Sequence, residues 1–506
     1  MQTSSPNNEK KTAKAKGTSS DAEVANPATQ SEVALVPAVT RQDFADGLRL
    51  DLNLGVAAYP VFLMAKPAQL LARYMETLIG QQTAERQSLR LNDPKRVIIL
   101  CDENTAELFG IDIETQFITA GWEIDALTVP AGEQAKTLAV VEQLCEALAT
   151  LGANRNTVLC SVGGGIMSDL AGFVAGIYKR GMHLAHISTT LVGLVDAAVG
   201  GKTAVNLPTG KNQIGMYKHP LAIVSDPAYL QQLPEEDYVC GLAEAAKTAL
   251  LAGEEFTAWV EANTELLLQR DPAILRELIA RCISFKASVV ASDPHEDNVP
   301  SARLSLNYGH TLGHVIETVT AQRFYDQQAQ QTEQAESDQS EHRQPEESNQ
   351  TSSDPSGEAA LGSPIPHGIA VAQGMRFEAR MAMQLVEADA SFVLRQDALL
   401  DALNLPALDP AIMGDDLANI TEVFYRDKKI ENSELRFILM ANPGNPEIVT
   451  VPREILYDHL RAWLSEHTRC SDSVSLLDSE RLEHSDNAEG MTGAEPALQA
   501  HEEDSQ

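Results

Sequence analysis

Residues 157–215 read TVLCSVGGGIMSDLAGFVAGIYKRGMHLAHISTTLVGLVDAAVGGKTAVNLPTGKNQIG. An apolar run, Val158 to Val162, predicts a buried strand that enters three glycines, Gly163, Gly164 and Gly165. A helical pattern follows from Asp169 to Tyr178. A strand, a glycine turn and a helix N-terminus direct backbone N–H groups and a positive dipole toward an anion. Glycine turns of this kind are often plain structure, so the triplet alone is weak evidence for a dinucleotide site.

The second half of this stretch places polar and basic residues at further turns. A second apolar run, Leu184 to Ile187, ends in Thr189 and Thr190. After it come Asp196, Gly200-Gly201-Lys202 and Gly210-Lys211-Asn212. Backbone that approaches phosphate closely needs glycine, because a Cβ would hold the ligand away, and lysine supplies the opposite charge. The density of such residues predicts a phosphorylated substrate beside a dinucleotide.

Charge and cysteine usage narrow the class of protein. The 506 residues carry a formal net charge of -34, and half of it comes from the segments 326–364 and 471–506. This acidity argues against nucleic acid and anionic membrane as partners. The 6 cysteines are widely spaced, which favours thiols in a reducing compartment. No apolar run is long enough to span a bilayer and no secretory leader is evident, so we expect a soluble cytoplasmic protein.

The pattern along the chain predicts two folded domains. Residues 1–42 form a predicted disordered tail, and alternating strands and helices over 43–234 predict an α/β domain with a parallel sheet, ending in the strand Ile223 to Asp226. Residues 235–467 are predicted to be mainly helical, interrupted by an acidic low-complexity insertion, 326–364, read as disordered. An acidic disordered tail, 468–506, is predicted to follow.

Periodicity also places individual elements. An early helix is predicted over Lys66–Leu78, a buried strand over Arg96–Cys101, and a lone late strand over Arg436–Met440. In the second domain the predicted helices are Cys240–Leu251, Glu254–Leu268, Pro272–Ser292, His310–Phe324, His367–Val386 and Val451–Leu464.

Four polar residues stand at a strand end or a helix start, and two of them, Asp102 and Asn104, are candidate ligand contacts from their position. Asp102 and Asn104 follow the strand at Arg96–Cys101, at the edge of the sheet where ligands bind. Asp102 could equally be a simple helix N-cap. Glu133 and Lys136 stand at a helix start. Taken alone, they are interpreted as a first-turn carboxylate and a solvated lysine.

Three places in the helical half offer metal ligands. Glu244 lies on a predicted helix with Lys247 one turn further on. His310 and His314 are four residues apart and so share a helix face, and His367 opens another helix. One carboxylate and two imidazoles with open positions suit zinc or a similar divalent ion. Taken alone, two histidines at this spacing are more often a coincidence of core or surface.

These motifs resemble the dehydroquinate synthase family of sugar-phosphate cyclases, through GGGIMSDLAGFVAGIYKRG, STTLVGLVDAAVGGKTAVN, GKNQIG and NYGHTLGHVIE. The resemblance implies a dehydroquinate synthase-like fold, an NAD-binding α/β domain followed by an α-helical metal domain. It implies Glu244, His310 and His367 as ligands of Zn²⁺ or Co²⁺, with His314 facing the substrate.

The resemblance also carries over other residues one at a time. It implies that substrate contact and catalysis involve Lys202, Lys247, Lys286, Arg303, Asn307, His314, Asn212 and Arg180. Arg180 matches an arginine that reaches the neighbouring subunit's phosphate site, which implies a homodimer. It implies NAD contacts at Asp102, Asn104, Glu133, Lys136, Gly163, Gly164, Gly165, Asp169, Thr189, Thr190, Asp196, Lys202 and Lys211.

The implied reaction converts 3-deoxy-D-arabino-heptulosonate 7-phosphate to 3-dehydroquinate and phosphate, a lyase step of the shikimate pathway toward chorismate and aromatic amino acids. The implied partners are therefore a small sugar phosphate and a second subunit. Alternatives are another cyclase, such as a 2-epi-5-epi-valiolone synthase, a metal-dependent polyol dehydrogenase, or a non-catalytic scaffold. The resemblance implies that the first of these alternatives lacks the second histidine of the motif, which this chain retains as His314.

The chain departs from the family pattern at several positions. The acidic insertion separates His310 from His367, although loop-closure cost grows only slowly with length. The loop before Arg303 is longer than usual, so the match of Glu296 to an acidic family residue is insecure, as is that of Lys428. Three usual polar residues are replaced by Ala197, Ala198 and Ile369.

Overall fold

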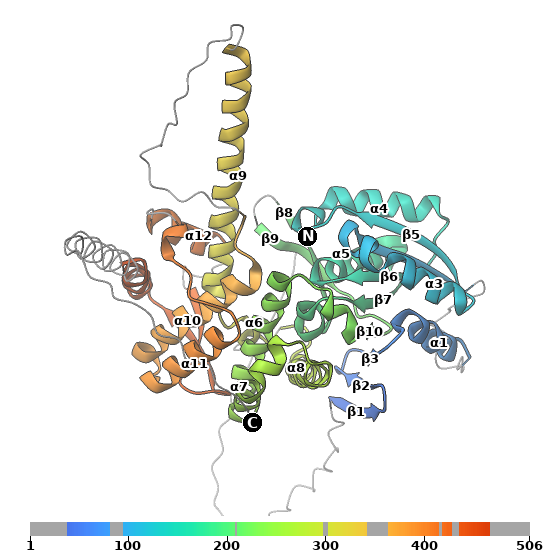
Figure 1. Cartoon of the computed structure of the whole chain (residues 1–506), viewed down its shortest axis with the longest axis horizontal. Coiled ribbons are helices and arrows are strands. Elements are labelled where there is room, and N and C mark those ends of the chain that lie inside the picture. Colours follow the sequence, from blue (N-terminus) through green and yellow to red (C-terminus); the bar gives the residue numbers. More distant parts are fainter. Residues whose placement is uncertain are drawn as a thin grey trace, which may run out of the picture. The chain divides into compact units, whose positions relative to one another are not determined.

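The computed structural model describes residues 38–80, 95–207, 210–296, 302–341, 363–413, 417–427 and 435–465. Within these ranges the main sheet has 8 strands (Figure 1). Their spatial order is β1 (Val39–Phe44), β2 (Gly47–Asn53), β3 (Ala58–Met64), β10 (Ile223–Ser225), β7 (His183–Ser188), β6 (Val158–Gly163), β4 (Arg96–Asp102) and β5 (Glu123–Val129). The predicted parallel sheet is confirmed from β3 to β5, where every neighbouring pair is parallel.

The first three strands are antiparallel and were not predicted. β1 begins at Val39, before the predicted domain start at residue 43. The alternating Leu48, Leu50 and Leu52 of β2 are buried, and this period of two is the signal of a half-buried strand. The strand predicted at Ile223 to Asp226 is confirmed, but it lies inside the sheet between β3 and β7.

Helices cover both faces of the parallel sheet. Along β4, Val97 and Ile99 belong to a core shared with α1 (Pro67–Gly80) and α3 (Ile111–Thr119). The intervening Ile98 and Leu100 pack with α4 (Leu138–Thr150) and α5 (Gly165–Ile177) on the opposite face. Because side chains alternate across a strand, the near-continuous apolar run of β4 serves both faces at once.

A two-stranded hairpin packs beside α5. Its strands are β8 (Lys202–Leu207) and β9 (Gly210–Tyr217), paired antiparallel. The approach to α5 is close enough that a Cβ on Gly172 would lie 2.2 Å from Thr203 Cγ2. The sequence showed the glycines and lysines of this hairpin but did not predict its strands.

The helical half confirms the predicted helices and adds to them. Its helices are α6 (Glu235–Ala252), α7 (Glu254–Leu268), α8 (Pro272–Ser292), α9 (His310–Glu341), α10 (His367–Leu385), α11 (Ala390–Ala402) and α12 (Leu417–Asp427), with residues 453–465 also helical. The late strand is not alone, because β11 (Leu435–Met440) pairs with β12 (Pro446–Val451). Among the described residues, no helix combines the length and apolar character needed to cross a bilayer.

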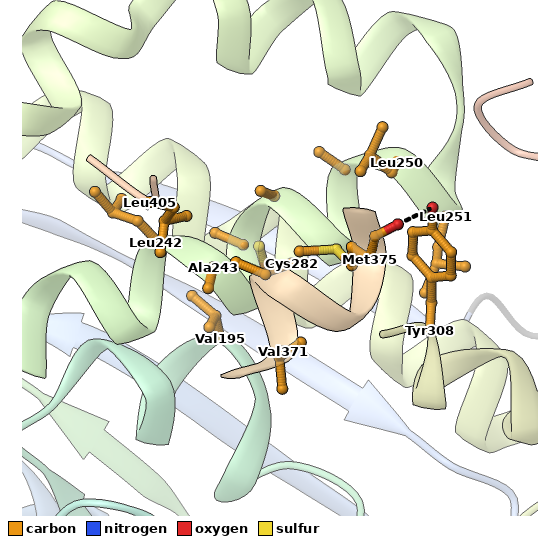
Figure 2. Close-up of a cluster of buried hydrophobic side chains, with 14 of the residues drawn as sticks. Val195, Leu242, Ala243, Leu250, Leu251, Cys282, Tyr308, Val371, Met375 and Leu405 are labelled. Atoms are coloured by element: carbon orange, nitrogen blue, oxygen red, sulfur yellow. Dashed lines mark hydrogen bonds between the residues drawn. The ribbon is translucent and has the colours of Figure 1, made fainter. Parts of the chain in front are cut away.

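One apolar core joins the helical half to the antiparallel strands. Figure 2 shows part of it, in which Leu242 and Ala243 of α6 belong to one cluster with Val195, Val371 and Met375. The same cluster includes leucines of β2 and β3. The predicted boundary at residues 234/235 therefore marks a change in secondary structure, while the hydrophobic core runs across it.

The acidic insertion differs from the expectation in one respect. The predicted helix end at Phe324 is wrong, because α9 continues to Glu341 (Figure 1). Gln, Glu and Ala dominate the added residues and are good helix formers, so low complexity did not prevent a helix. Residues 342–362 lie outside the described residues. The backbone N–H of Ile365 donates to Thr320 Oγ1 at 3.3 Å, so the chain returns to the base of α9.

Candidate active site

Three side chains from three helices meet in the helical half. Glu244 lies on α6, and His310 and His367 are the first residues of α9 and α10. Their potential ligand atoms all lie within 4.8 Å of one another. Glu244 Oε1 is 3.2 Å from His367 Nε2 and 3.6 Å from His310 Nε2. The predicted metal ligands are therefore brought together.

Glycines allow these helices to approach closely. A Cβ on Gly368 would lie 2.3 Å from Cys240 Cα, so α10 starts directly against α6. A Cβ on Gly374 would lie 1.8 Å from the carbonyl oxygen of Gly309, which joins α10 to the start of α9. The short imidazole and carboxylate side chains can meet only because the backbones are this near.

The carboxylate of Glu244 fits a bound cation. It is completely buried, and neither oxygen has a geometrically sound hydrogen bond among the described residues, although Lys247 Nζ lies 2.5 Å from Oε2. A buried charge short of hydrogen bonds is costly unless a cation compensates it. Two imidazole nitrogens beside one carboxylate oxygen form a donor set suited to Zn²⁺ or Co²⁺.

The two histidines differ in environment. His310 Nδ1 lies 3.1 Å from the Tyr308 carbonyl, which accepts its proton and leaves Nε2 for a ligand. Burial, helped by the charge of Lys247, lowers the pKa of His310 to about 3. Burial also acts to lower the pKa of His367, but the neighbouring carboxylates of Glu244 and Glu317 raise it to about 10. A divalent cation would replace the positive charge that His367 otherwise supplies.

A lysine cluster lies next to the metal ligands. Asp196, on the short helical turn Gly193–Ala197, pairs with Lys286 and has Lys247 Nζ at 3.8 Å. Burial opposes ionisation of Asp196, but Lys286 and Lys247 hold its pKa at about 2. Burial lowers the pKa of Lys286. Lys247 touches both Glu244 and Asp196, so the metal ligands and the predicted lysines form one site.

The start of the β8–β9 hairpin meets the turn before α9. Arg303 donates to the carbonyls of Pro294 and Gly200, the latter at 3.2 Å. Lys202 pairs with Glu296. The sequence matched Glu296 only insecurely to an acidic residue of the family. In the structure this carboxylate lies beside Lys202, a lysine expected to bind substrate or cofactor.

The glycine turn leads into α5 as predicted. Gly163 has φ 147°, and Gly164, at the N-cap, provides no side-chain cap. The N–H of Thr189 donates to the Gly163 carbonyl at 3.0 Å, and Thr190 Oγ1 accepts from Gly193 N at 3.1 Å. A Cβ on Gly164 would lie 2.8 Å from Thr190 Oγ1. An uncapped helix N-terminus beside glycine backbone fits the phosphates of a dinucleotide.

A buried lysine, Lys136, contacts several of the other residues predicted to bind the cofactor. Lys136 is 4% exposed and donates to Asp169 Oδ2 at 2.8 Å and to Asn212 Oδ1 at 2.7 Å. Glu133 Oε1 lies 3.6 Å from its ammonium group. Burial raises the pKa of Asp169, although the charge of Lys136 acts against that shift. The alternative of a solvated lysine is therefore wrong for Lys136.

Some predicted residues do not join these clusters. Asp102 caps the helical turn Glu103–Thr105, accepting from Thr105 N at 2.8 Å, and Asn104 is exposed. Arg180 is exposed just past the C-terminal end of α5, opposite the glycine turn. Asn307 is half-buried at the end of the 3-10 segment Ala302–Asn307, and Lys428 lies outside the described residues.

Sequence reasoning missed Glu317. Its carboxylate lies 3.3 Å from His367 Nδ1 and 2.8 Å from Lys211 Nζ. His314 is also close, with its ring centroid 5.5 Å from that of His310. The spacing i, i+4, i+7 from His310 to His314 and Glu317 puts all three on one helix face, and this signal was available in the sequence.

The fold and the site define a class of enzyme, in which a dinucleotide-binding α/β half is joined to a helical half with a Glu–His–His metal centre. Residues 126–240 match the family model described as 3-dehydroquinate synthase N-terminal, and residues 241–327 match the C-terminal one. A 3-dehydroquinate synthase from Symbiobacterium thermophilum is 31% identical over 79% of this chain and 96% of its own length. One from Shewanella loihica is 32% identical over 79% and 95%. The chain belongs to the 3-dehydroquinate synthase family.

Solved structures of other cyclases have the same fold. A 2-deoxy-scyllo-inosose synthase, complexed with carbaglucose-6-phosphate, NAD⁺ and Co²⁺, has a TM-score of 0.62 at 23% identity and covers 84% of this chain and 99% of that one. A 2-epi-5-epi-valiolone synthase from Streptomyces hygroscopicus, with NAD⁺ and Zn²⁺ bound, has a TM-score of 0.59 at 20% identity, covering 82% and 97%. At these identities the likeness establishes the fold.

Proposed function

We propose that this protein acts as a 3-dehydroquinate synthase, a lyase that converts 3-deoxy-D-arabino-heptulosonate 7-phosphate to 3-dehydroquinate and phosphate. The observation that carries the proposal is the convergence of Glu244, His310 and His367 within 4.8 Å, beside a buried lysine cluster. Family membership supports the same activity, since relatives that align over nearly their whole length bear this name.

The residues present fit both expected cofactors. We propose that Glu244, His310 and His367 hold Zn²⁺ or Co²⁺, and that the glycine turn and the Lys136 cluster hold NAD. When bound, NAD⁺ would accept and return a hydride, and the divalent cation would polarise substrate oxygens as a Lewis acid.

The charged side chains around this centre would bind the anionic substrate. Lys286, whose side chain is 12% exposed, lies close to the metal ligands through Asp196 and Lys247, so it is placed to neutralise a phosphate or carboxylate. Arg303 and Lys202 extend the positive charge toward the β8–β9 hairpin. Asn307 adds an uncharged donor at the end of the 3-10 segment that precedes α9.

Proton transfer needs no strong base from the protein, because the substrate's phosphate can accept a proton itself. His314 lies with its ring centroid 6.5 Å from that of His367 and is the candidate to hold or move a proton at its imidazole. The lysines of the site, above all Lys247, would keep its charge positive while phosphate leaves.

A homodimer and a cytoplasmic location belong to the same proposal. Arg180 is exposed at the far end of α5, about 20 Å from the glycine turn by helix rise. It is therefore better placed to serve a neighbouring subunit than its own site. The described cysteines, Cys101, Cys145, Cys160, Cys240 and Cys282, are free thiols, which is typical of a reducing compartment.

The direct test measures phosphate release from the proposed substrate with NAD⁺ and Zn²⁺ or Co²⁺. We expect the wild type to turn over without net NADH. We expect His310→Ala to lose both its bound metal and its turnover. Net NADH would identify a polyol dehydrogenase instead. Turnover of a seven-carbon sugar phosphate without a carboxylate, and none of the proposed substrate, would identify another cyclase.

A further inference from the structure

Glu317 lies between the metal ligands and the β8–β9 hairpin. Its side chain comes from α9, two turns after His310, and the residue is only 7% exposed. Oε2 lies 3.3 Å from His367 Nδ1, and Oε1 lies 2.8 Å from Lys211 Nζ on β9. One buried carboxylate thus contacts a metal ligand on one side and a predicted cofactor residue on the other.

The contact with His367 fixes which nitrogen of the ring faces the centre. With Nδ1 directed at Glu317, Nε2 points to Glu244, whose Oε1 is 3.2 Å away. An acceptor at one ring nitrogen keeps the proton there and leaves the other nitrogen as the metal donor. A carboxylate is a stronger acceptor than a backbone carbonyl, so it also increases the donor strength of the ring.

The two histidine ligands do not need this help equally. The side chain of His310 is 11% exposed and is held by the packing around it and by the Tyr308 carbonyl. The side chain of His367 is 38% exposed, so less packing fixes its ring. Its position therefore depends more on the carboxylate behind it.

A simple salt bridge to Lys211 does not account for a buried Glu317. The Lys211 side chain is 43% exposed, and an ion pair with a half-exposed lysine contributes little to stability. Burying a carboxylate for such a small gain would be unfavourable. The contact with His367 gives the carboxylate a second partner and a reason to be buried.

We propose that Glu317 is a positioning residue, which orients His367 for the metal. The inference rests on the metal centre of the proposed function. It concerns metal binding, so it can be tested without turnover.

The test titrates the metal-free protein with Co²⁺ and follows its visible absorption bands, which report the geometry around the ion. We expect Glu317→Ala to weaken Co²⁺ binding about 10- to 100-fold and to shift the bands, as loss of an outer-shell partner does. Glu317→Gln keeps an acceptor for the ring proton without the charge, and we expect a smaller loss of about three- to tenfold. Lys211→Met is the matched control, since it removes the other contact and should leave Co²⁺ affinity within about twofold.

Thermal unfolding of the metal-free variants shows whether a loss of Co²⁺ affinity comes from misorientation of the His367 ring or from a general loss of stability. Wild-type affinity and bands in Glu317→Ala would overturn the proposal, as would a Lys211→Met variant that loses as much affinity as Glu317→Ala. If Glu317→Ala does not fold, Glu317→Gln decides, and binding indistinguishable from wild type would overturn it. A wild type that binds Co²⁺ tightly but releases no phosphate would reject the proposed reaction and leave the role of Glu317 standing.

Discussion

Two carboxylates of the site, the partly exposed Asp169 and the completely buried Glu244, have different surroundings. Asp169, on α5, accepts from Lys136, and the same ammonium group donates to Asn212. Glu244, on α6, has neither oxygen in a sound hydrogen bond among the described residues and faces two histidines as well as Lys247. The Asp169 carboxylate is therefore satisfied by neighbouring side chains, whereas the Glu244 carboxylate is left without a sound hydrogen bond among the described residues. The surroundings of Glu244 therefore suit a bound cation.

The largest expected effect removes the charge of Glu244. In Glu244→Gln, affinity for Zn²⁺ or Co²⁺ should fall by more than about 100-fold, beyond the losses typical of outer-shell partners. The metal-free protein should still fold, because Lys247 keeps Asp196 as a partner. Metal content and circular dichroism of the purified variant measure both effects. A variant that retains its metal would contradict the proposal that Glu244 is a metal ligand.

The matching change on the other side is Asp169→Asn. It leaves the buried Lys136 without its closest charged partner, so the free energy of unfolding should fall by about 2 kcal/mol, less than for a fully buried pair because Asp169 is partly exposed. Metal affinity should not change. Urea unfolding and Co²⁺ titration of the same preparation test both statements, and a loss of metal without a loss of stability would contradict the contrast.

A third test uses a buried polar pair inside the sheet that contacts neither Asp169 nor Glu244. His186 Nδ1 lies 2.7 Å from Ser161 Oγ inside the sheet, and burial lowers the pKa of His186 to about 4. The folded state therefore binds this proton less readily than the unfolded chain, whose histidine pKa is near 6.5. The contribution of neutral His186 to the free energy of unfolding is therefore fully present above about pH 6.5 and is lost as pH falls toward 4. At pH 5 the free energy of unfolding should be lower by about 2 kcal/mol.

The control is His186→Gln, which cannot take up the proton. The difference in unfolding free energy between wild type and variant should grow from pH 5 to pH 7. Equal pH slopes for the two proteins would show that another group dominates.

The smallest expected effect concerns the acidic insertion. Replacing residues 326–362 with a short Gly-Ser linker should change metal affinity and turnover by less than about twofold, because loop length affects closure cost only logarithmically. The anchors of α9 remain, since Arg323 donates to the Ile412 carbonyl at 2.6 Å and Ile365 still meets Thr320. Loss of metal in this variant would mean that the insertion takes part in the site.

Local patterns in the sequence carried much of the fold. The apolar run at β6, the glycine turn and the strong helical periods of α7 and α8 were confirmed at or near their predicted ends. The strands β1 and β2 were missed because β1 is mostly exposed and β2 alternates between buried and partly buried residues, so neither has the continuous apolar run of a parallel strand. The strand β3 has a continuous buried run, but Pro60 within it argues against a strand. The end of α9 was missed because composition argued for disorder where helix propensity prevailed.

The sequence by itself determined the chemistry available: the ligand types at Glu244, His310 and His367, and the glycines that allow close approach. Only the tertiary structure decided how these groups meet, because contacts such as Gly368 against Cys240 and Glu317 against Lys211 join residues more than 100 positions apart. Local pattern cannot encode such distances. They follow from the packing of α6, α9 and α10 around one shared core.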